Sequence, residues 1–357
     1  RPKATEHIPE IIDMIENLIE GGFAYESEGH VLFHVPSDPN YGSLSKRSLE
    51  DMLAGARVEI ASYKKDPKDF ILWKPSSSDL PGWASPWGRG RPGWHIECSA
   101  MIQKHLGGHI DIHGGGSDLT FPHHENEAAQ SRCANRSEDY VNYWLHNGMI
   151  TLANEKMSKS LGNILSIRTL LQRHSGEVLR YALLSGHYRS SLSWSDDLIK
   201  QAKSSLDSLY QTLRDHSEKA ALGSVPIDSS LEYNHELELA LCDDLNTPKA
   251  LAALHRMGDE LRNAEDDESA LRKRNDLIQA GSLLGLLQDD PEAYFKGSVG
   301  SETGDDLSES KIESLIEERN QARADRDFNL ADQIRQSLLE KGIELEDQRS
   351  GTRWRRI

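Results

Sequence analysis

The sequence is poor in cysteine and has no long hydrophobic run. Only 3 of its 357 residues are cysteine, and their wide spacing predicts no disulfide framework but leaves room for a metal-bound thiolate. No run of about 18 apolar residues occurs, and the first residues have no apolar signal core. We therefore expect a cytoplasmic protein with no membrane partner.

Basic residues are in the minority. Lysine and arginine total 41 against 58 acidic residues, which gives a formal net charge of −17. Because phosphate neutralisation requires basic side chains, this charge argues against a protein that coats nucleic acid indiscriminately, but it is compatible with local basic patches. The chain is longer than one hydrophobic core usually serves, so we expect two or three domains.

Histidine is concentrated in one stretch, residues 94–130, which contains six of the 15 histidines. Within it, alternating apolar and polar residues at 109–113 predict a strand, Gly114–Gly116 predict a turn, and Pro122 is expected to begin a helix. In α/β sheets, ligands bind beyond the carboxyl ends of strands, where helix N-termini point outward. The stretch is therefore the predicted floor of a binding site.

Three residues of this stretch are candidate metal ligands. His123 and Glu127 are four residues apart and share a helix face, while Cys98 lies on the preceding predicted helix. All three residue types bind zinc. His124 competes with His123, because it is three residues from Glu127 and spacing does not separate the two. A surface His–Glu pair and a small core cysteine are the alternative interpretation.

Two further motifs indicate a nucleotide site. Gly114, Gly115 and Gly116 would let the backbone lie against a base or ribose, and Asp118 would accept hydrogen bonds from ribose hydroxyls. The sequence KMSKS at 156–160 places two ammonium groups three residues apart in a polar segment. Such a loop would close over a polyphosphate and stabilise charge on a leaving pyrophosphate.

Apolar periodicity predicts other elements in the first half of the chain. A first helix is expected to end at Gly21, and a hairpin is expected to turn at Ser27–Gly29. Phe70–Trp73 reads as a strand and Tyr140–Ile150 as a buried strand. Pro75–Gly93 reads as a loop in which Arg89 and Arg91 lie between aromatic residues; it is either a packed structural loop or, as the alternative, a substrate contact.

The second half of the chain is predicted to be mainly helical. Apolar seams, such as the one from Leu198 to Leu213, predict a bundle over about residues 196–290, in which Pro248 occupies the first position of a helix. Residues 296–306 have the composition of a linker, and a helix pair follows them.

The C-terminal tail is basic. Residues 349–357 contain four arginines and Trp354 but no acidic residue. An exposed tryptophan among arginines would be a platform for unstacked bases, and a basic edge strand is the alternative.

Four blocks, residues 93–101, 113–130, 156–163 and 351–357, resemble cysteinyl-tRNA synthetases, a family of class I aminoacyl-tRNA synthetases. The resemblance implies an α/β fold: a Rossmann-like catalytic domain, then an all-α helical bundle and a small α+β C-terminal domain. The implied domains are a connective-peptide insertion with the return to the catalytic domain (1–90), the C-terminal half of that domain (91–195), a tRNA-binding helical bundle (196–295), a linker (296–306) and an anticodon-binding domain (307–357).

The resemblance also implies a reaction and its cofactors. L-Cysteine is activated with ATP and Mg²⁺ to cysteinyl-adenylate and is then transferred to tRNA(Cys). The family holds one zinc ion with two Cys, one His and one Glu, of which Cys98, His123 and Glu127 match three. Because zinc takes a thiolate more readily than a hydroxyl, the metal would reject serine. We also expect a monomer.

Other residue roles follow from the same resemblance. Trp94 matches the tryptophan of the amino-acid pocket, His113 to Asp118 match the adenosine loop, and Lys156 and Lys159 match the signature loop that acts on the ATP phosphates. The anticodon candidates are Arg349, Arg353, Trp354 and Arg355.

The sequence departs from the family pattern at its start. The HIGH signature, the first strand and the first zinc cysteine have no counterpart in the 357 residues. We expect them to precede Arg1, and we expect these residues alone not to catalyse adenylation.

Two alternative functions compete with the tRNA ligase. A mycothiol-pathway ligase transfers cysteine to an amino sugar, but it lacks the anticodon domain and typically has Gln where this chain has His113. A non-catalytic paralogue would bind tRNA only. Residues 307–357 argue against the first alternative, and the intact KMSKS and metal residues argue against the second.

Overall fold

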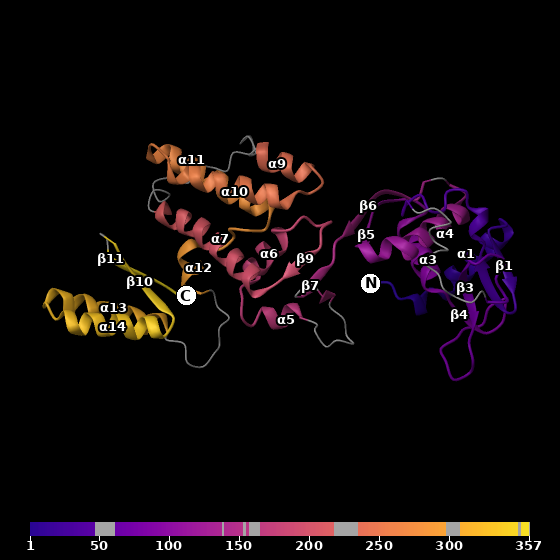
Figure 1. Cartoon of the computed structure of the whole chain (residues 1–357), viewed down its shortest axis with the longest axis horizontal. Helices are drawn as coiled ribbons and strands as arrows, with labels where there is room; N and C mark the ends of the chain where they lie inside the picture. Colours follow the sequence, from indigo (N-terminus) through magenta and orange to yellow (C-terminus); the bar gives the residue numbers. More distant parts are fainter. Residues whose placement is uncertain are drawn as a thin grey trace. The chain divides into compact units, whose positions relative to one another are not determined.

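The chain forms two compact units, Arg1–Met149 and Ile150–Ile357 (Figure 1). The structure is a computed structural model, and it describes residues 1–46, 61–137, 139–152, 155–156, 165–217, 235–297, 308–348 and 351–356. Among the helices in these ranges, none combines the length and the apolar content needed to span a bilayer.

The first unit combines helices with two sheets. An antiparallel sheet has the order β1-β2-β3-β4, and a parallel pair is formed by β5 and β6. Its longer elements are α1 (Ile8–Glu20), β1 (Ala24–Ser27), β2 (His30–Phe33), β3 (Phe70–Pro75), β4 (Gly90–Pro92), α3 (Trp94–Leu106), β5 (Ile110–Gly116), α4 (Glu125–Asn135) and β6 (Val141–Asn147). Short helical segments occupy Ala4–Glu6 (η1), Val35–Ser37 (η2), Ser117–Leu119 (η3) and Thr120–His124 (η4).

Helix α1 and the predicted hairpin are confirmed. Ile11, Ile15 and Leu18 repeat at helical spacing and are fully buried in the core that also contains Trp73 and Ile96. Fully burying each such side chain stabilises the fold by about 1.5–3 kcal/mol. In the hairpin, strands β1 and β2 pair in register, with Ser27 opposite His30.

The glycine stretch was predicted wrongly as a turn. Gly114, Gly115 and Gly116 complete β5 and pair in parallel with Leu145, His146 and Asn147 of β6. The ladder of β6 keeps these glycines extended, so the chain turns only at Ser117–Leu119. After the extended residue Phe121, the chain is helical from Pro122 through His124 and continues directly into α4, so the predicted helix start at Pro122 is confirmed.

Strand β6 exists, but it is not buried as predicted. It covers Val141–Asn147, and its side chains are half-buried or exposed, with Tyr143 at 67% exposure. The reason is that, among the described residues, β5 is its only sheet neighbour. The predicted segment also contains Ile150, which instead begins β7.

The predicted loop Pro75–Gly93 contains a short strand. Residues Gly90–Pro92 form β4 against β3, and Trp83 bridges to Gly90. Arg89 donates hydrogen bonds to the carbonyl oxygens of Leu80 and Gly82, so this arginine stabilises the conformation of the loop.

The second unit begins with a small sheet of order β8-β7-β9 and continues as helices. Its sheet and bundle elements are β7 (Ile150–Leu152), β8 (Glu155–Lys156), α5 (Ile167–Leu170), α6 (Gly176–Leu184), β9 (Leu192–Trp194), α7 (Asp196–Asp215), α9 (His235–Cys242), α10 (Thr247–Arg262), α11 (Asp267–Leu283) and α12 (Pro291–Lys296). Its C-terminal elements are α13 (Glu309–Ala324), α14 (Phe328–Glu340), β10 (Ile343–Gln348) and β11 (Gly351–Arg356).

The predicted bundle helices are confirmed. The seam of α7 contributes Leu206, Leu209 and Leu213 to one core shared with α6, α9, α10 and α11. The start of α10 differs slightly from the prediction: Asn246 caps the helix by accepting a hydrogen bond from the backbone of Lys249, which places Pro248 at the second position instead of the first.

The C-terminal elements form a module with its own core (yellow in Figure 1). The hairpin β10–β11 and the helices α13 and α14 share the buried residues Ile312, Ile316, Ile334, Leu338, Ile343, Leu345 and Trp354. Trp354 is only 4% exposed, so the prediction of an exposed stacking platform is wrong and the alternative of a basic strand is confirmed. The tryptophan is buried because it faces Leu345 across the hairpin.

Candidate functional site

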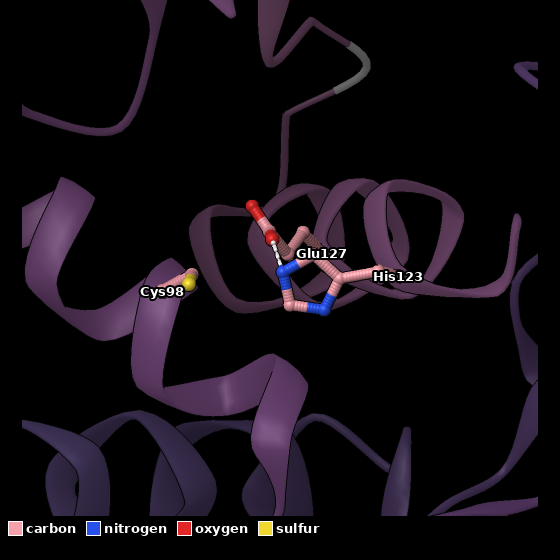
Figure 2. Close-up of side chains that lie close together, drawn as sticks. All are labelled: Cys98, His123 and Glu127. Carbon is pink, nitrogen blue, oxygen red and sulfur yellow. Dashed lines mark ion pairs between the residues drawn. The ribbon is translucent and has the colours of Figure 1, made fainter. Parts of the chain in front are cut away.

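The predicted metal ligands converge in the first unit. Cys98 lies on α3, His123 lies in the helical segment η4 before α4, and Glu127 lies in the first turn of α4 (Figure 2). Their donor atoms lie within 4.8 Å of one another. The close packing of α3 against α4 therefore brings together residues that are 29 positions apart in the sequence.

The three side chains are shielded from solvent. His123 and Glu127 are buried and Cys98 is half-buried. His123 Nε2 lies 2.5 Å from Glu127 Oε1, and His113 Nε2 lies 3.5 Å from Glu127 Oε2. Within the described residues, neither oxygen of Glu127 has a hydrogen bond of good geometry. Because a buried carboxylate without such bonds is costly, this arrangement fits a cation.

The donor set also fits zinc in particular. A thiolate, an imidazole nitrogen and a carboxylate are all zinc ligands. Burial, followed by the negative charges of Glu127 and Glu97, raises the pKa of the Cys98 thiol to about 12. A bound cation would oppose both effects and favour the thiolate.

His95 holds the ring of His123. The Nδ1 atoms of the two rings are 2.8 Å apart, which leaves His123 Nε2 facing Glu127. Burial, and secondarily His123, lowers the pKa of His95 to about 4, so its ring is neutral at pH 7 and accepts this bond when His123 donates. Trp94, 58% exposed at the start of α3, stacks on His123 with ring centroids 4.2 Å apart.

A second group of histidines adjoins the first. His113, His124 and Glu127 also have donor atoms within 4.8 Å of one another. His124 Nδ1 lies 2.8 Å from His146 Nε2 on β6, and burial, followed by His113 and His146, lowers the pKa of His124 to about 3. The structure thus groups His123, and not His124, with Cys98.

The glycines of β5 lie tightly against this second group. A Cβ on Gly115 would lie 2.7 Å from His124 Cε1, and one on Gly116 would lie 2.5 Å from Asp118 Oδ1. Only glycine fits these two positions without displacing its neighbours. Asp118, in the helical segment η3 after the strand, is exposed.

A cavity of about 650 Å³ adjoins the cluster. Its lining includes Cys98 and His113 together with Met101, Ile102 and His105.

The KMSKS prediction falls mostly outside the described residues. The backbone of Lys156 pairs with Thr151 in the small sheet of the second unit. The side chain of Lys156 and the whole of Lys159 lie outside the described ranges, as does Arg349.

The other tail arginines form ion pairs inside the second unit. Arg355 Nη2 lies 2.6 Å from Glu344 Oε2, and Arg353 Nε lies 3.5 Å from Glu292 Oε1.

The sequence interpretation missed an aromatic residue that is more exposed than Trp354. Phe328, at the start of α14, is 61% exposed. Its signal in the sequence was a single aromatic residue between Arg326 and a polar helix.

Spacing also missed the contacts between histidines. His95 and His146 have no periodic relation to the residues that they contact, because these contacts join separate elements. Their concentration in one part of the chain was the only signal.

Comparison with known proteins gives concordant results. Residues 1–204 match the model of the tRNA synthetases class I (C) catalytic domain, and residues 237–288 match the DALR domain. The cysteine–tRNA ligase of Xanthomonas campestris pv. campestris is 55% identical over 99% of this chain and 75% of its own length. That of Saccharophagus degradans is 54% identical over 100% of this chain and 76% of its own length.

A solved structure supports the fold. The methionyl-tRNA synthetase of Mycobacterium tuberculosis, in complex with methionyl-adenylate, matches with a TM-score of 0.53 and 15% identity over 79% of this chain and 72% of its own. The α/β class I synthetase fold with a following helical domain, expected from the sequence, is confirmed.

Proposed function

This chain belongs to the class I cysteine–tRNA ligase family, and we propose that its buried cluster of Cys98, His123 and Glu127 selects the substrate by its thiol. The reaction activates L-cysteine with ATP to cysteinyl-adenylate and transfers the cysteinyl group to tRNA(Cys). The amino-sugar ligase alternative is not favoured, because the relatives that match 99–100% of the chain are named as tRNA ligases.

Cys98, His123 and Glu127 would hold one zinc ion. The observation that carries this proposal is a buried carboxylate without hydrogen bonds of good geometry, beside an imidazole and a thiol. When bound, zinc supplies a soft Lewis acid that takes the substrate thiolate and discriminates against the hydroxyl of serine.

The protein residues around the cluster orient and cover it. His95 keeps His123 Nε2 directed toward Glu127 through the contact between the two Nδ1 atoms. Such a contact fixes the ring and the tautomer of a ligand histidine. Trp94, stacked on His123, is the proposed wall of the amino-acid pocket.

Adenylation requires mainly positioning and charge stabilisation. An oxygen of the cysteine carboxylate attacks the α-phosphorus of ATP in line, the bond to the bridging oxygen breaks, and pyrophosphate leaves with the electron pair. We assign the adenosine contacts to His113, Gly114–Gly116 and Asp118. Lys156 and Lys159 would stabilise the charge on the phosphates, with Mg²⁺ accompanying ATP.

The transfer step completes the reaction. A hydroxyl of the 3′-terminal ribose of tRNA attacks the carbonyl carbon of the adenylate, and AMP leaves. The C-terminal module is the proposed anticodon-binding domain, with Arg349, Arg353 and Arg355 as candidates. Since Trp354 is buried, we assign base stacking to the exposed Phe328, near Arg323 and Arg326 in the sequence.

One assay of the intact enzyme tests this assignment. Pyrophosphate exchange should depend on cysteine and should be at least about 10⁴-fold less efficient with serine, a discrimination of the size that a polar specificity site reaches. Charging should occur with tRNA(Cys). Exchange without charging would favour the amino-sugar ligase, and charging without discrimination against serine would refute the metal-based selection. We further propose a monomer located in the cytoplasm.

A further inference from the structure

Arg214 is a buried charged residue that joins two parts of the second unit. It lies in the last turn of α7 and is 1% exposed. Its Nε and Nη2 donate to Glu292 Oε1 and Oε2 at 2.8 and 3.0 Å. Its Nη1 donates to Glu346 Oε2 at 3.2 Å, and Nη2 also donates to the carbonyl oxygen of Trp354 at 3.4 Å.

These partners come from different structural parts. Helix α7 and helix α12, which carries Glu292, belong to the helical bundle and share its core. Glu346 on β10 and Trp354 on β11 belong to the C-terminal module, which has a separate core. A single guanidinium therefore bridges the bundle and the module.

Other contacts at this junction are also polar. Arg353 Nε lies 3.5 Å from Glu292 Oε1, and its Nη1 lies 3.9 Å from Asp215 Oδ1. Arg356 donates to the carbonyl oxygen of Lys296 at 3.0 Å. The covalent connection between α12 and α13 (residues 297–308) is rich in Gly, Ser and Asp, a composition that does not itself fix an orientation. Directional hydrogen bonds must therefore supply much of the orientation.

Because Arg214 is buried, the loss of any one of its hydrogen-bond partners should disturb the junction between the bundle and the module. A buried guanidinium is tolerated only when its donors are paired, and a bidentate carboxylate defines the plane in which it lies. With Glu292 setting that plane from the bundle side, Glu346 and the Trp354 carbonyl can be met only by a module in one orientation.

We propose that Arg214 is a positioning residue for tRNA, which holds the C-terminal module in the orientation that lets bundle and module contact one tRNA together. The inference rests on the proposed function, in which the module reads the anticodon. When the bundle has bound tRNA, the module meets the same tRNA at a high effective concentration, which strengthens binding overall. This gain in affinity is lost when the orientation of the module relative to the bundle is not fixed. Loss of Arg214 should therefore weaken tRNA binding without affecting the chemistry of cysteine activation.

Two variants of the intact enzyme test the proposal. Arg214→Met removes the bridge. Glu346→Gln removes the charge on the module side, which also lies 3.5 Å from Arg355, and it leaves the pair of Arg214 with Glu292 and the bundle intact. We expect Arg214→Met to raise the KM for tRNA about tenfold, equivalent to about 1.4 kcal/mol, and Glu346→Gln to raise it less. The matched control is Glu340→Gln, an exposed carboxylate of the module whose partner Gln336 lies in the same helix, and its KM for tRNA should be unchanged.

Cysteine-dependent pyrophosphate exchange separates positioning from general damage. It should stay within about twofold of wild type in all three variants, because a change in orientation leaves adenylation intact. An unchanged KM for tRNA in both junction variants, or exchange activity that falls in parallel with charging, would overturn the inference. Failure of the wild-type enzyme to charge tRNA(Cys) would refute the proposed function instead.

Discussion

The cluster around Glu127 and the junction around Arg214 both bury charged residues, but they satisfy them differently. Every nitrogen of the Arg214 guanidinium donates to a protein oxygen. Both oxygens of Glu127 lack a hydrogen bond of good geometry among the described residues. A buried charge whose hydrogen bonds are all made to protein atoms stabilises the structure. A buried charge whose oxygens lack such hydrogen bonds indicates a ligand.

The largest expected effect tests the ligand side of this comparison. Cys98→Ser should lower cysteine-dependent pyrophosphate exchange by about 100-fold or more, because a hydroxyl replaces a soft metal ligand. Cys133→Ser is the matched control: Cys133 is also a shielded thiol whose pKa burial raises to about 12, but it is not part of the cluster. Equal losses in the two variants would mean that Cys98 is a packing residue.

His95 should show a smaller effect of the same origin. Replacing it with alanine removes the contact that orients His123, and we expect zinc affinity to fall by about 10-fold, measured by competition with a chelator. His109→Ala is the control, since His109 is exposed and contacts Asn142 instead. Unchanged zinc affinity in His95→Ala would show that His123 is held by other contacts.

Phe328 and Trp354 offer a comparison between an exposed and a buried aromatic residue. Phe328→Ala should raise the KM for tRNA about fivefold, since stacking on a base contributes about 1–3 kcal/mol, and should spare pyrophosphate exchange. Leu339→Ala, at another exposed position of α14, should change neither value. A tRNA KM that is unchanged in Phe328→Ala would contradict the stacking role.

In contrast, Trp354→Ala should destabilise the module by about 3–5 kcal/mol, measured by its thermal unfolding.

The smallest expected effect concerns Asp347, a second charged residue whose hydrogen bonds are made to protein atoms. Arg319 donates to both of its carboxylate oxygens at 2.8 Å, and this pair holds the pKa of Asp347 well below its usual range. A lowered pKa contributes stability above the unfolded value, near pH 4, and this stability is lost as the pH falls toward the folded value. Asp347→Asn should therefore lower the Tm by about 2 °C at pH 7, and the difference should shrink below about pH 4. A difference that is independent of pH would point to packing instead of charge.

Local patterns predicted much of the molecule because they act over a few residues. The apolar spacing of α1 and α7 predicted their buried faces, and the i, i+4 relation predicted the His123–Glu127 pair. The glycines of β5 were misread because glycine favours turns when taken alone, and the ladder with β6 overrode this preference.

Contacts between distant segments could not be predicted from spacing. His95 meets His123 across 28 positions, and Arg214 meets Glu346 across 132. The burial of Trp354 likewise depends on the hairpin that folds it over Leu345. Each of these follows from tertiary packing, which a one-dimensional pattern does not contain.

The zinc content of the purified intact enzyme tests the central claim most directly. Measured by elemental analysis on wild type, Cys133→Ser and Glu127→Gln, it should be about one zinc ion per chain in the first two proteins and close to none in Glu127→Gln, which loses the buried carboxylate. Full zinc content in Glu127→Gln, or none in wild type, would contradict the assignment of Cys98, His123 and Glu127 as the metal site.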